Sequence, residues 1–174
     1  MARNSRSRIE SSGSASRLRT RPDPSVRPAT RSFRYSPAQA AIPGYPEPSA
    51  AWIDEWQRRL AHYRLTPTNI CSWVDNQMWP DRDLTEEEAA AQLARDVRLA
   101  HRLGFGFIRP KFGVISPELD PHPTWEETVL RTLDLAAELD VVICPEIHSP
   151  TPIKHPVTQN YIEFIERTGT GTSS

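Results

Sequence analysis

A carboxylate and an imidazole stand two residues apart after an apolar run in the last quarter of the chain. The run is Val141–Cys144, and Glu146 and His148 follow it. A run that is apolar on both faces predicts a strand of a parallel sheet covered by helices on both sides. The carboxyl ends of such strands are where α/β proteins place their chemistry. We therefore predict that Glu146 and His148 face a common site.

These two residue types suit metal binding and proton transfer. The Glu146 carboxylate offers an oxygen ligand to a hard ion such as Mn²⁺ or Mg²⁺. The alternative is a loop carboxylate that caps the helix starting at Pro156 or pairs with Lys154. In extended backbone His148 projects to the same side as Glu146, and an imidazole can move protons next to a carbonyl near neutral pH. The alternative for His148 is a solvated loop residue.

A second group of candidate residues follows two earlier apolar segments. Arg109 and Lys111 are predicted at the carboxyl end of a strand, where a cation could hold an anionic or hydroxyl-rich substrate. Salt bridges to loop acids such as Glu118 or Asp120 are the alternative. Trp73 is predicted at the end of another strand. Its ring could stack on a sugar, or it could pack in the core.

Three strand segments position these residues. They begin near residues 68, 105 and 141, about 36 residues apart, with a helix between each pair. The first is read as Leu65–Val74 and the second as Phe105–Ile108. Helices are predicted from about 50 to 63 with Trp52, Trp56, Leu60 and Tyr63 on the buried face, from a capping box at Thr85 to Gly104, from a second capping box at Thr124, and from Pro156 to Gly169.

This order indicates an α/β fold of consecutive βα units, either a doubly wound sheet or a (β/α)₈ barrel. A full barrel needs eight units and about 250 residues, whereas the chain has 174. We predict a disordered basic tail over residues 1–40, the βα units over 41–169, and an unstructured end over 170–174.

Charge and cysteine content limit the class of function. The net charge of −1 recruits neither nucleic acid nor membrane. Nine arginines among residues 1–34 leave a basic nucleic-acid-binding arm as a weak alternative, because no folded nucleic-acid motif follows them. Cys71 and Cys144 are expected to be buried, reduced thiols. No apolar run reaches a membrane span of ~18 residues, and no signal peptide follows Met1, so a cytoplasmic protein is expected.

Three stretches of the sequence resemble a known family. They are Leu65–Thr68, Leu99–Phe105 together with Arg109–Lys111, and Pro145–Pro152 with its Glu-x-His pattern. From Leu65 to about Gly169 the chain resembles the first half of a xylose isomerase-like barrel, the superfamily of sugar isomerases and epimerases. Within that superfamily it is similar to the barrel-forming catalytic subunit of C-glycoside deglycosidases.

The resemblance implies an incomplete TIM barrel that acts on a small-molecule sugar or glycoside. In the family a divalent metal, usually Mn²⁺, is held by carboxylates and a histidine from several strand ends. Glu146 matches the first of these ligands, and His148 matches a histidine that moves protons on the sugar. The remaining ligands come from later strands, which this sequence does not contain. The resemblance thus implies a metal-dependent isomerase, epimerase or C-glycoside-cleaving lyase; the alternative is an inactive half barrel that associates with itself or with a complementary subunit.

Overall fold

The computed structural model describes residues 41–113, 120–147 and 152–169, which all lie within one compact unit, residues 34–174. The predictions for the basic tail, the last five residues and His148 lie outside the described residues. The elements in chain order are α2 (Ala50–Tyr63), β1 (Asn69–Val74), α3 (Glu86–Leu103), β2 (Phe107–Phe112), α4 (Trp125–Glu138), β3 (Val142–Ile143) and α5 (Pro156–Thr168).

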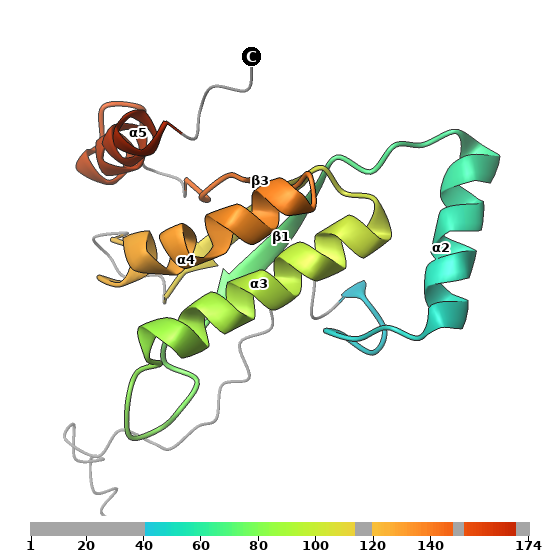
Figure 1. Cartoon of the computed structure of the whole chain (residues 1–174), viewed down its shortest axis with the longest axis horizontal. Coiled ribbons are helices and arrows are strands. Elements are labelled where there is room, and N and C mark those ends of the chain that lie inside the picture. Colours follow the sequence, from blue (N-terminus) through green and yellow to red (C-terminus); the bar gives the residue numbers. More distant parts are fainter. Residues whose placement is uncertain (1–40, 114–119, 148–151, 170–174) are drawn as a thin grey trace, which may run out of the picture. The chain divides into compact units, whose positions relative to one another are not determined.

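The three strands form a parallel sheet in the order β1-β2-β3 (Figure 1). Each strand is followed by a helix, so the prediction of an α/β fold built from βα units is confirmed. The β3 ladder continues past the strand itself, because the N–H groups of Cys144 and Glu146 donate to the carbonyls of Ile108 and Pro110 at 2.8 and 2.9 Å. Glu146 is therefore fixed beside β2 by backbone hydrogen bonds.

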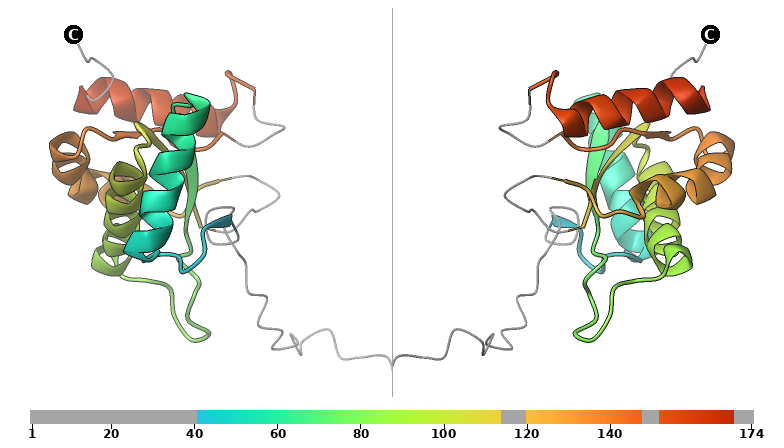
Figure 2. Two further views of the ribbon diagram at one scale, coloured as in Figure 1. Left: turned by 90° about the vertical axis from the view of Figure 1, so that its right-hand side faces the viewer. Right: turned by 90° about the vertical axis from the view of Figure 1, so that its left-hand side faces the viewer.

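Helices α3 and α4 lie side by side on one face of the sheet (Figures 1 and 2). The apolar residues of α3 recur at helical spacing, and Ala89, Leu93, Val97, Ala100 and Leu103 are all buried. Alternate strand residues point toward these helices and are buried with them. The core includes Ile70, Val74, Ala89, Leu93, Val97, Ala100, Leu103, Ile108, Phe112, Val129 and Ala136.

The other face of the sheet, which we name the open face, carries side chains that are exposed or half-buried. Phe107 and Val142 are register partners on it and are 47% and 44% exposed. The predicted cover on both sides of Val141–Cys144 is therefore wrong for the described residues, because α3 and α4 both pack on the same face. The open face consists of Asn69, Cys71, Trp73, Phe107, Arg109, Lys111, Val142, Cys144 and Glu146.

Local signals set most of the helix ends. Thr85 and Glu88 form the predicted capping box, and Gly104 ends α3 in the left-handed conformation with φ of 80°. The capping box predicted at Thr124 is wrong. The Thr124 hydroxyl makes no cap hydrogen bond to the helix, because it contacts His122 Nδ1 at 2.8 Å instead.

Several predicted boundaries also need correction. Strand β1 begins at Asn69, next to the predicted start near residue 68, although the predicted segment was read from Leu65 onward. Strand β2 runs to Phe112, so Arg109 and Lys111 lie within the strand and not after it. Strand β3 is two residues long. On the predicted buried stripe of α2, Tyr63 is 65% exposed and the other three residues are only partly buried; the buried residue of this helix is Ile53.

A buried polar network ties the segment before α2 to the sheet. Asp96 of α3 is 3% exposed and accepts hydrogen bonds from Tyr45, Ser72 and Arg95. Burial, with the Asp96 carboxylate beside the phenol, raises the pKa of Tyr45 above its ordinary value. A buried carboxylate is tolerated when donors surround it, so this network fixes Tyr45 and its neighbours against α3 and β1.

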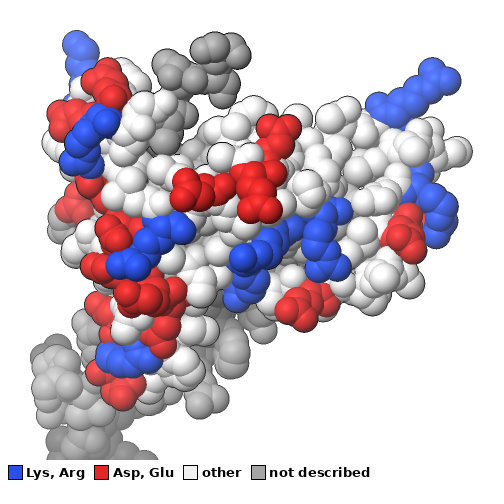
Figure 3. All heavy atoms as spheres, in the orientation of Figure 1, with Lys and Arg blue, Asp and Glu red and all other residues white. Residues whose placement is uncertain are grey.

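Ion pairs join the outer surfaces of α3 and α4. Arg131 of α4 lies within 4.0 Å of Glu86, Glu87 and Glu127. Acidic and basic side chains are interspersed on the side of the molecule that Figure 3 shows, which carries these two helices. Within the described part of the chain, no helix combines the length and the apolar character that crossing a bilayer requires.

Candidate functional site

The open face brings together four of the five residues that the sequence singled out. Trp73 on β1 and Lys111 on β2 are register partners, and the Lys111 ammonium lies 4.4 Å from the centre of the Trp73 ring. The Trp73 indole N–H donates to the Gly113 carbonyl at 2.7 Å. The ring is thus fixed at its edge by a hydrogen bond and has a cation over its face.

Arg109 lies between an acceptor on β1 and another in the segment that follows β3. Its Nη2 donates to the Cys71 sulfur at 2.9 Å and lies 3.7 Å from Glu146 Oε1. The Arg109 side chain is 44% exposed and that of Glu146 is 22% exposed. The predicted alternatives for Arg109 were salt bridges to loop acids; its ion pair in the structure is with Glu146, another predicted site residue.

The start of α5 excludes one alternative role of Glu146, which was to cap this helix. The side chain of His155 caps this helix by accepting from the Val157 N–H at 3.3 Å, so Glu146 is not its N-cap. Burial, together with the negative charge of Glu146, raises the pKa of Tyr161 to about 12. The packing of Tyr161 on Trp125 of α4, with ring centres 4.7 Å apart, holds α5 near Glu146. His148, the fifth predicted site residue, lies outside the described residues.

The described donors do not fit a divalent metal. The ions predicted from the sequence, Mn²⁺ and Mg²⁺, take about six ligands, mostly oxygens. Among the described residues no group of three or more His, Cys, Asp or Glu side chains could hold a metal ion. Glu146 is the one carboxylate of the open face, and it has a guanidinium beside it.

The thiols differ from their predicted state. Cys71 and Cys144 are free, as predicted, but each is half-buried on the open face. Burial raises the pKa of Cys144 above its ordinary value. Both thiols flank Arg109. The apolar runs around them predicted burial and did not predict this position beside a cation.

A polar cluster at the carboxyl ends of β1 and β2 was not predicted. His122 Nε2 lies 3.2 Å from Asp83 Oδ2, and its Nδ1 lies 2.8 Å from the Thr124 hydroxyl. Asn76 is buried beside them, with its Oδ1 atom lacking a partner. The sequence signal that could have found the cluster is His122 between two prolines ahead of a helix. Both ring nitrogens of His122 have partners, so the cluster joins the loops after β1 and β2.

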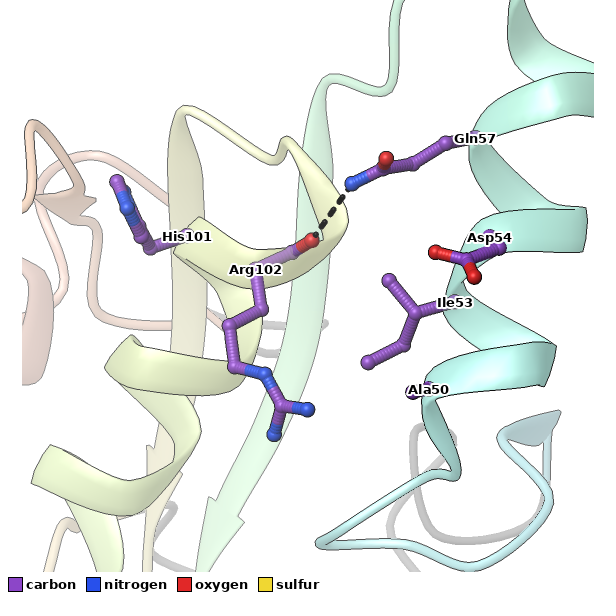
Figure 4. Close-up of a pocket in the computed structure, with 6 residues that line it drawn as sticks. All are labelled: Ala50, Ile53, Asp54, Gln57, His101 and Arg102. Carbon is purple, nitrogen blue, oxygen red and sulfur yellow. Dashed lines mark hydrogen bonds between the residues drawn. The ribbon is translucent and has the colours of Figure 1, made fainter.

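A hollow of about 440 Å³ lies between α2 and α3 (Figure 4). Gln57 bridges the two helices by donating to the Arg102 carbonyl at 3.3 Å. None of the predicted site residues lines this hollow, which lies beside the last turn of α3. It is lined by Ala50, Ile53, Asp54, Gln57, His101 and Arg102.

The side chains of the open face are of the types that contact polar, ring-shaped ligands. The indole of Trp73, the cations of Arg109 and Lys111, and the carboxylate of Glu146 come from adjacent segments of the sheet and lie on the same face. Aromatic faces contact the apolar surface of a sugar ring, while charged groups hydrogen-bond to hydroxyl and carbonyl oxygens.

Two curated proteins are similar in sequence to this chain. No protein-family model matches the chain. The chain is 30% identical over 129 residues to the 3'-dehydrocarminate deglycosidase alpha subunit of Microbacterium sp, covering 74% of this chain and 34% of that protein. It is 29% identical over 106 residues to the C-glycoside deglycosidase alpha subunit of Arthrobacter globiformis, covering 61% of this chain and 27% of that protein. The chain thus spans 34% and 27% of the length of these two curated relatives.

Proposed function

We propose that this chain forms part of a glycoside-cleaving protein and that its open face binds the sugar. The similarity to two deglycosidase alpha subunits carries the proposal. The structure supports it by gathering Trp73, Arg109, Lys111 and Glu146 on one face of the sheet. We assign the substrate to the C-glycosides, the class that one relative's name states.

The proposed roles follow from the chemistry of each side chain. Trp73 contacts the sugar ring, Lys111 hydrogen-bonds to its oxygens, and the Glu146 carboxylate, with Arg109 beside it, accepts hydrogen bonds from its hydroxyl groups. A carbonyl on the sugar, such as the 3'-dehydro form in the name of the other relative, makes the neighbouring C–H acidic. His148 is proposed to take that proton, and the bond to the aglycone then breaks as the aglycone receives a proton. The same proton transfer without bond cleavage would give an isomerase or epimerase.

The predicted divalent metal has no complete site in the described residues, and we derive no step through it. Glu146 remains the residue proposed to contribute to such a site, because it lies at the carboxyl end of β3 on the open face. A complete site would need carboxylates or imidazoles beyond the described residues.

A barrel segment is the architecture that we propose. Parallel strands in chain order, with α3 and α4 on one face, match consecutive units of a (β/α)₈ barrel, whose helices all lie outside. The open face would then line the barrel interior. A doubly wound sheet would instead cover this face with helices from another part of the chain.

The exposed side of the sheet favours a second, compatible function, which is association with another polypeptide. Parallel sheets are rarely open on one face, and strands at a sheet edge pair readily with further strands. Phe107 and Val142 form an exposed apolar pair on the open face. We therefore propose that a complementary subunit or a second copy of this chain covers it. The cytoplasmic location and the absence of a nucleic-acid partner remain predictions.

Calorimetric titration with a phenyl C-glucoside and with its 3-oxo derivative tests the proposed function. The 174-residue chain is compared with Glu146→Gln and with Glu86→Gln, which alters a glutamate of α3 on the other side of the sheet. We expect binding by the wild type, weaker binding by Glu146→Gln, and unchanged binding by Glu86→Gln. A wild-type chain that binds neither glucoside would contradict the proposal.

A further inference from the structure

Arg109 connects the strand on each side of it through a single nitrogen. Nη2 reaches the Cys71 sulfur at 2.9 Å on β1 and lies 3.7 Å from Glu146 Oε1 beyond β3. Cys71 is the register partner of Arg109, so their side chains leave the sheet side by side. The backbone bond from the Glu146 N–H to the Pro110 carbonyl fixes the third member of this row.

The contact with Cys71 limits where the guanidinium can lie. A guanidinium is planar, permanently charged, and carries its donors in a fixed fork. On an exposed strand position such a side chain normally samples many rotamers. A second contact on the opposite side reduces that freedom, which keeps the positive charge next to Glu146.

We propose that Arg109 is a positioning residue that orients Glu146 toward the ligand on the open face and that Cys71 anchors it. The sugar ligand in this inference rests on the proposed function. The bridge, by which we mean the contacts of Arg109 with Cys71 and Glu146, rests on the geometry alone. It replaces the predicted substrate-binding role of Arg109 with an indirect one. Lys111, which lies over Trp73, remains the cation assigned to the substrate.

The bridge makes Cys71 a reporter of the state of Glu146. The positive charge of Arg109 attracts an anionic thiol reagent such as dithiobis(nitrobenzoate), and the negative charge of Glu146 repels it. Loss of Arg109 should therefore slow labelling of Cys71, whereas loss of the Glu146 charge should speed it. Cys144 is compared in the same chain: it also flanks Arg109, so its rate shows the effect of the charges alone, and a larger change at Cys71 reports the hydrogen bond from Arg109.

The first measurement is the labelling rate of each thiol, followed by mass spectrometry of peptides from the full chain. The variants are Arg109→Gln, Arg109→Lys and Glu146→Gln, with Arg58→Gln as the matched control that loses an arginine–glutamate pair on α2. We expect the Cys71 rate to fall in Arg109→Gln, to rise in Glu146→Gln, and to stay unchanged in Arg58→Gln. Equal Cys71 rates in the wild type, Arg109→Gln and Glu146→Gln would overturn the bridge.

The second measurement is the affinity for the phenyl C-glucoside. Loss of the ion pair that orients the Glu146 carboxylate should weaken binding about two- to fivefold in Arg109→Gln. Arg109→Lys keeps the charge without the fork, so its affinity should lie between those of the wild type and Arg109→Gln. Cooperative thermal unfolding shows that each variant is folded. If Arg109→Gln does not fold, Arg109→Lys is compared with the wild type instead.

The two proposals fail in different ways. Wild-type binding that Arg109→Gln leaves unchanged would overturn the positioning role and leave the proposed function standing. Coupled Cys71 rates in a wild-type chain that binds no glucoside would support the bridge and overturn the proposed function.

Discussion

The Lys111 ammonium lies 4.4 Å from the centre of the Trp73 ring, across the ladder that joins β1 and β2. The same indole donates its N–H to the Gly113 carbonyl, just past the end of β2. Two separate contacts therefore fix Trp73 at the carboxyl end of the open face. This pair is the best-defined part of the candidate site.

Replacement of Lys111 by methionine should remove the cation and keep most of the side-chain volume. A cation over an aromatic face contributes about 0.5–1 kcal/mol at an exposed site, so we expect the free energy of unfolding in urea to fall by about that amount. Lys154→Met, at an exposed position outside the sheet, should change it by less than about 0.5 kcal/mol. Equal effects of the two substitutions would count against the pair.

Gly113 should tolerate alanine much less well than Gly106. Gly113 has φ of +76°, and a Cβ placed there would lie 3.1 Å from the His122 Cβ. Gly106 has nothing within 4 Å of such a Cβ. The left-handed conformation alone costs a non-glycine residue about 1–2 kcal/mol, so Gly113→Ala should lower the unfolding free energy by at least that amount. Urea unfolding that is equally affected by Gly106→Ala would contradict the local geometry.

Acid should weaken the start of α3 through Glu88. The hydrogen bond from Arg82, followed by that from the Thr85 backbone N–H, lowers the pKa of Glu88 from 4.5 to about 2. Because the folded-state pKa is depressed, the contribution of Glu88 to stability is present above pH ~4.5 and is lost as pH falls toward about 2. Carboxyl-detected NMR should give a midpoint near 2 for Glu88, and Glu88→Gln should remove this part of the acid dependence. A midpoint at the ordinary glutamate value would show that the capping box and the Arg82 pair are absent in solution.

Addition of Mn²⁺ should leave the melting temperature of the isolated chain unchanged. A ligand that binds only the folded state raises its stability, but the described residues offer no group of three or more metal-ligating side chains. The measurement is thermal unfolding with and without Mn²⁺, for the wild type and for Glu146→Gln. A rise in melting temperature that Glu146→Gln abolishes would show that residues outside the described ranges complete a metal site.

The helix ends could be predicted from sequence because their causes lie within one turn. Thr85 and Glu88 are three residues apart, and Gly104 and Gly169 adopt the left-handed conformation where their helices end. Thr124 had the same local pattern as Thr85 and did not form a capping box. The Thr124 hydroxyl contacts His122, two residues before it, and the pattern of capping residues alone does not predict this competing contact.

The candidate site was harder to predict because it depends on contacts between strands. The second strand was predicted to stop at Ile108, but the Pro110 carbonyl accepts from the Glu146 N–H and β2 continues to Phe112. The apolar character of Val142 predicted a buried position. The described residues provide no layer over the open face, so Val142 is 44% exposed. Neither the Arg109–Cys71 contact nor the absence of cover could be read from periodicity.

Sugar binding by the open face can be followed in the NMR spectrum of the tryptophan indole N–H groups during titration with the phenyl C-glucoside. Trp73 donates to Gly113 at the candidate site, while Trp56 donates to Leu103 where α2 meets α3. Trp73→Phe assigns the first signal and Trp56→Phe the second. If the open face binds the sugar, the Trp73 signal should shift with added glucoside and the Trp56 signal should stay in place. A titration that shifts Trp56 alone, or that leaves both signals unmoved, would contradict the assignment of the open face as a sugar site.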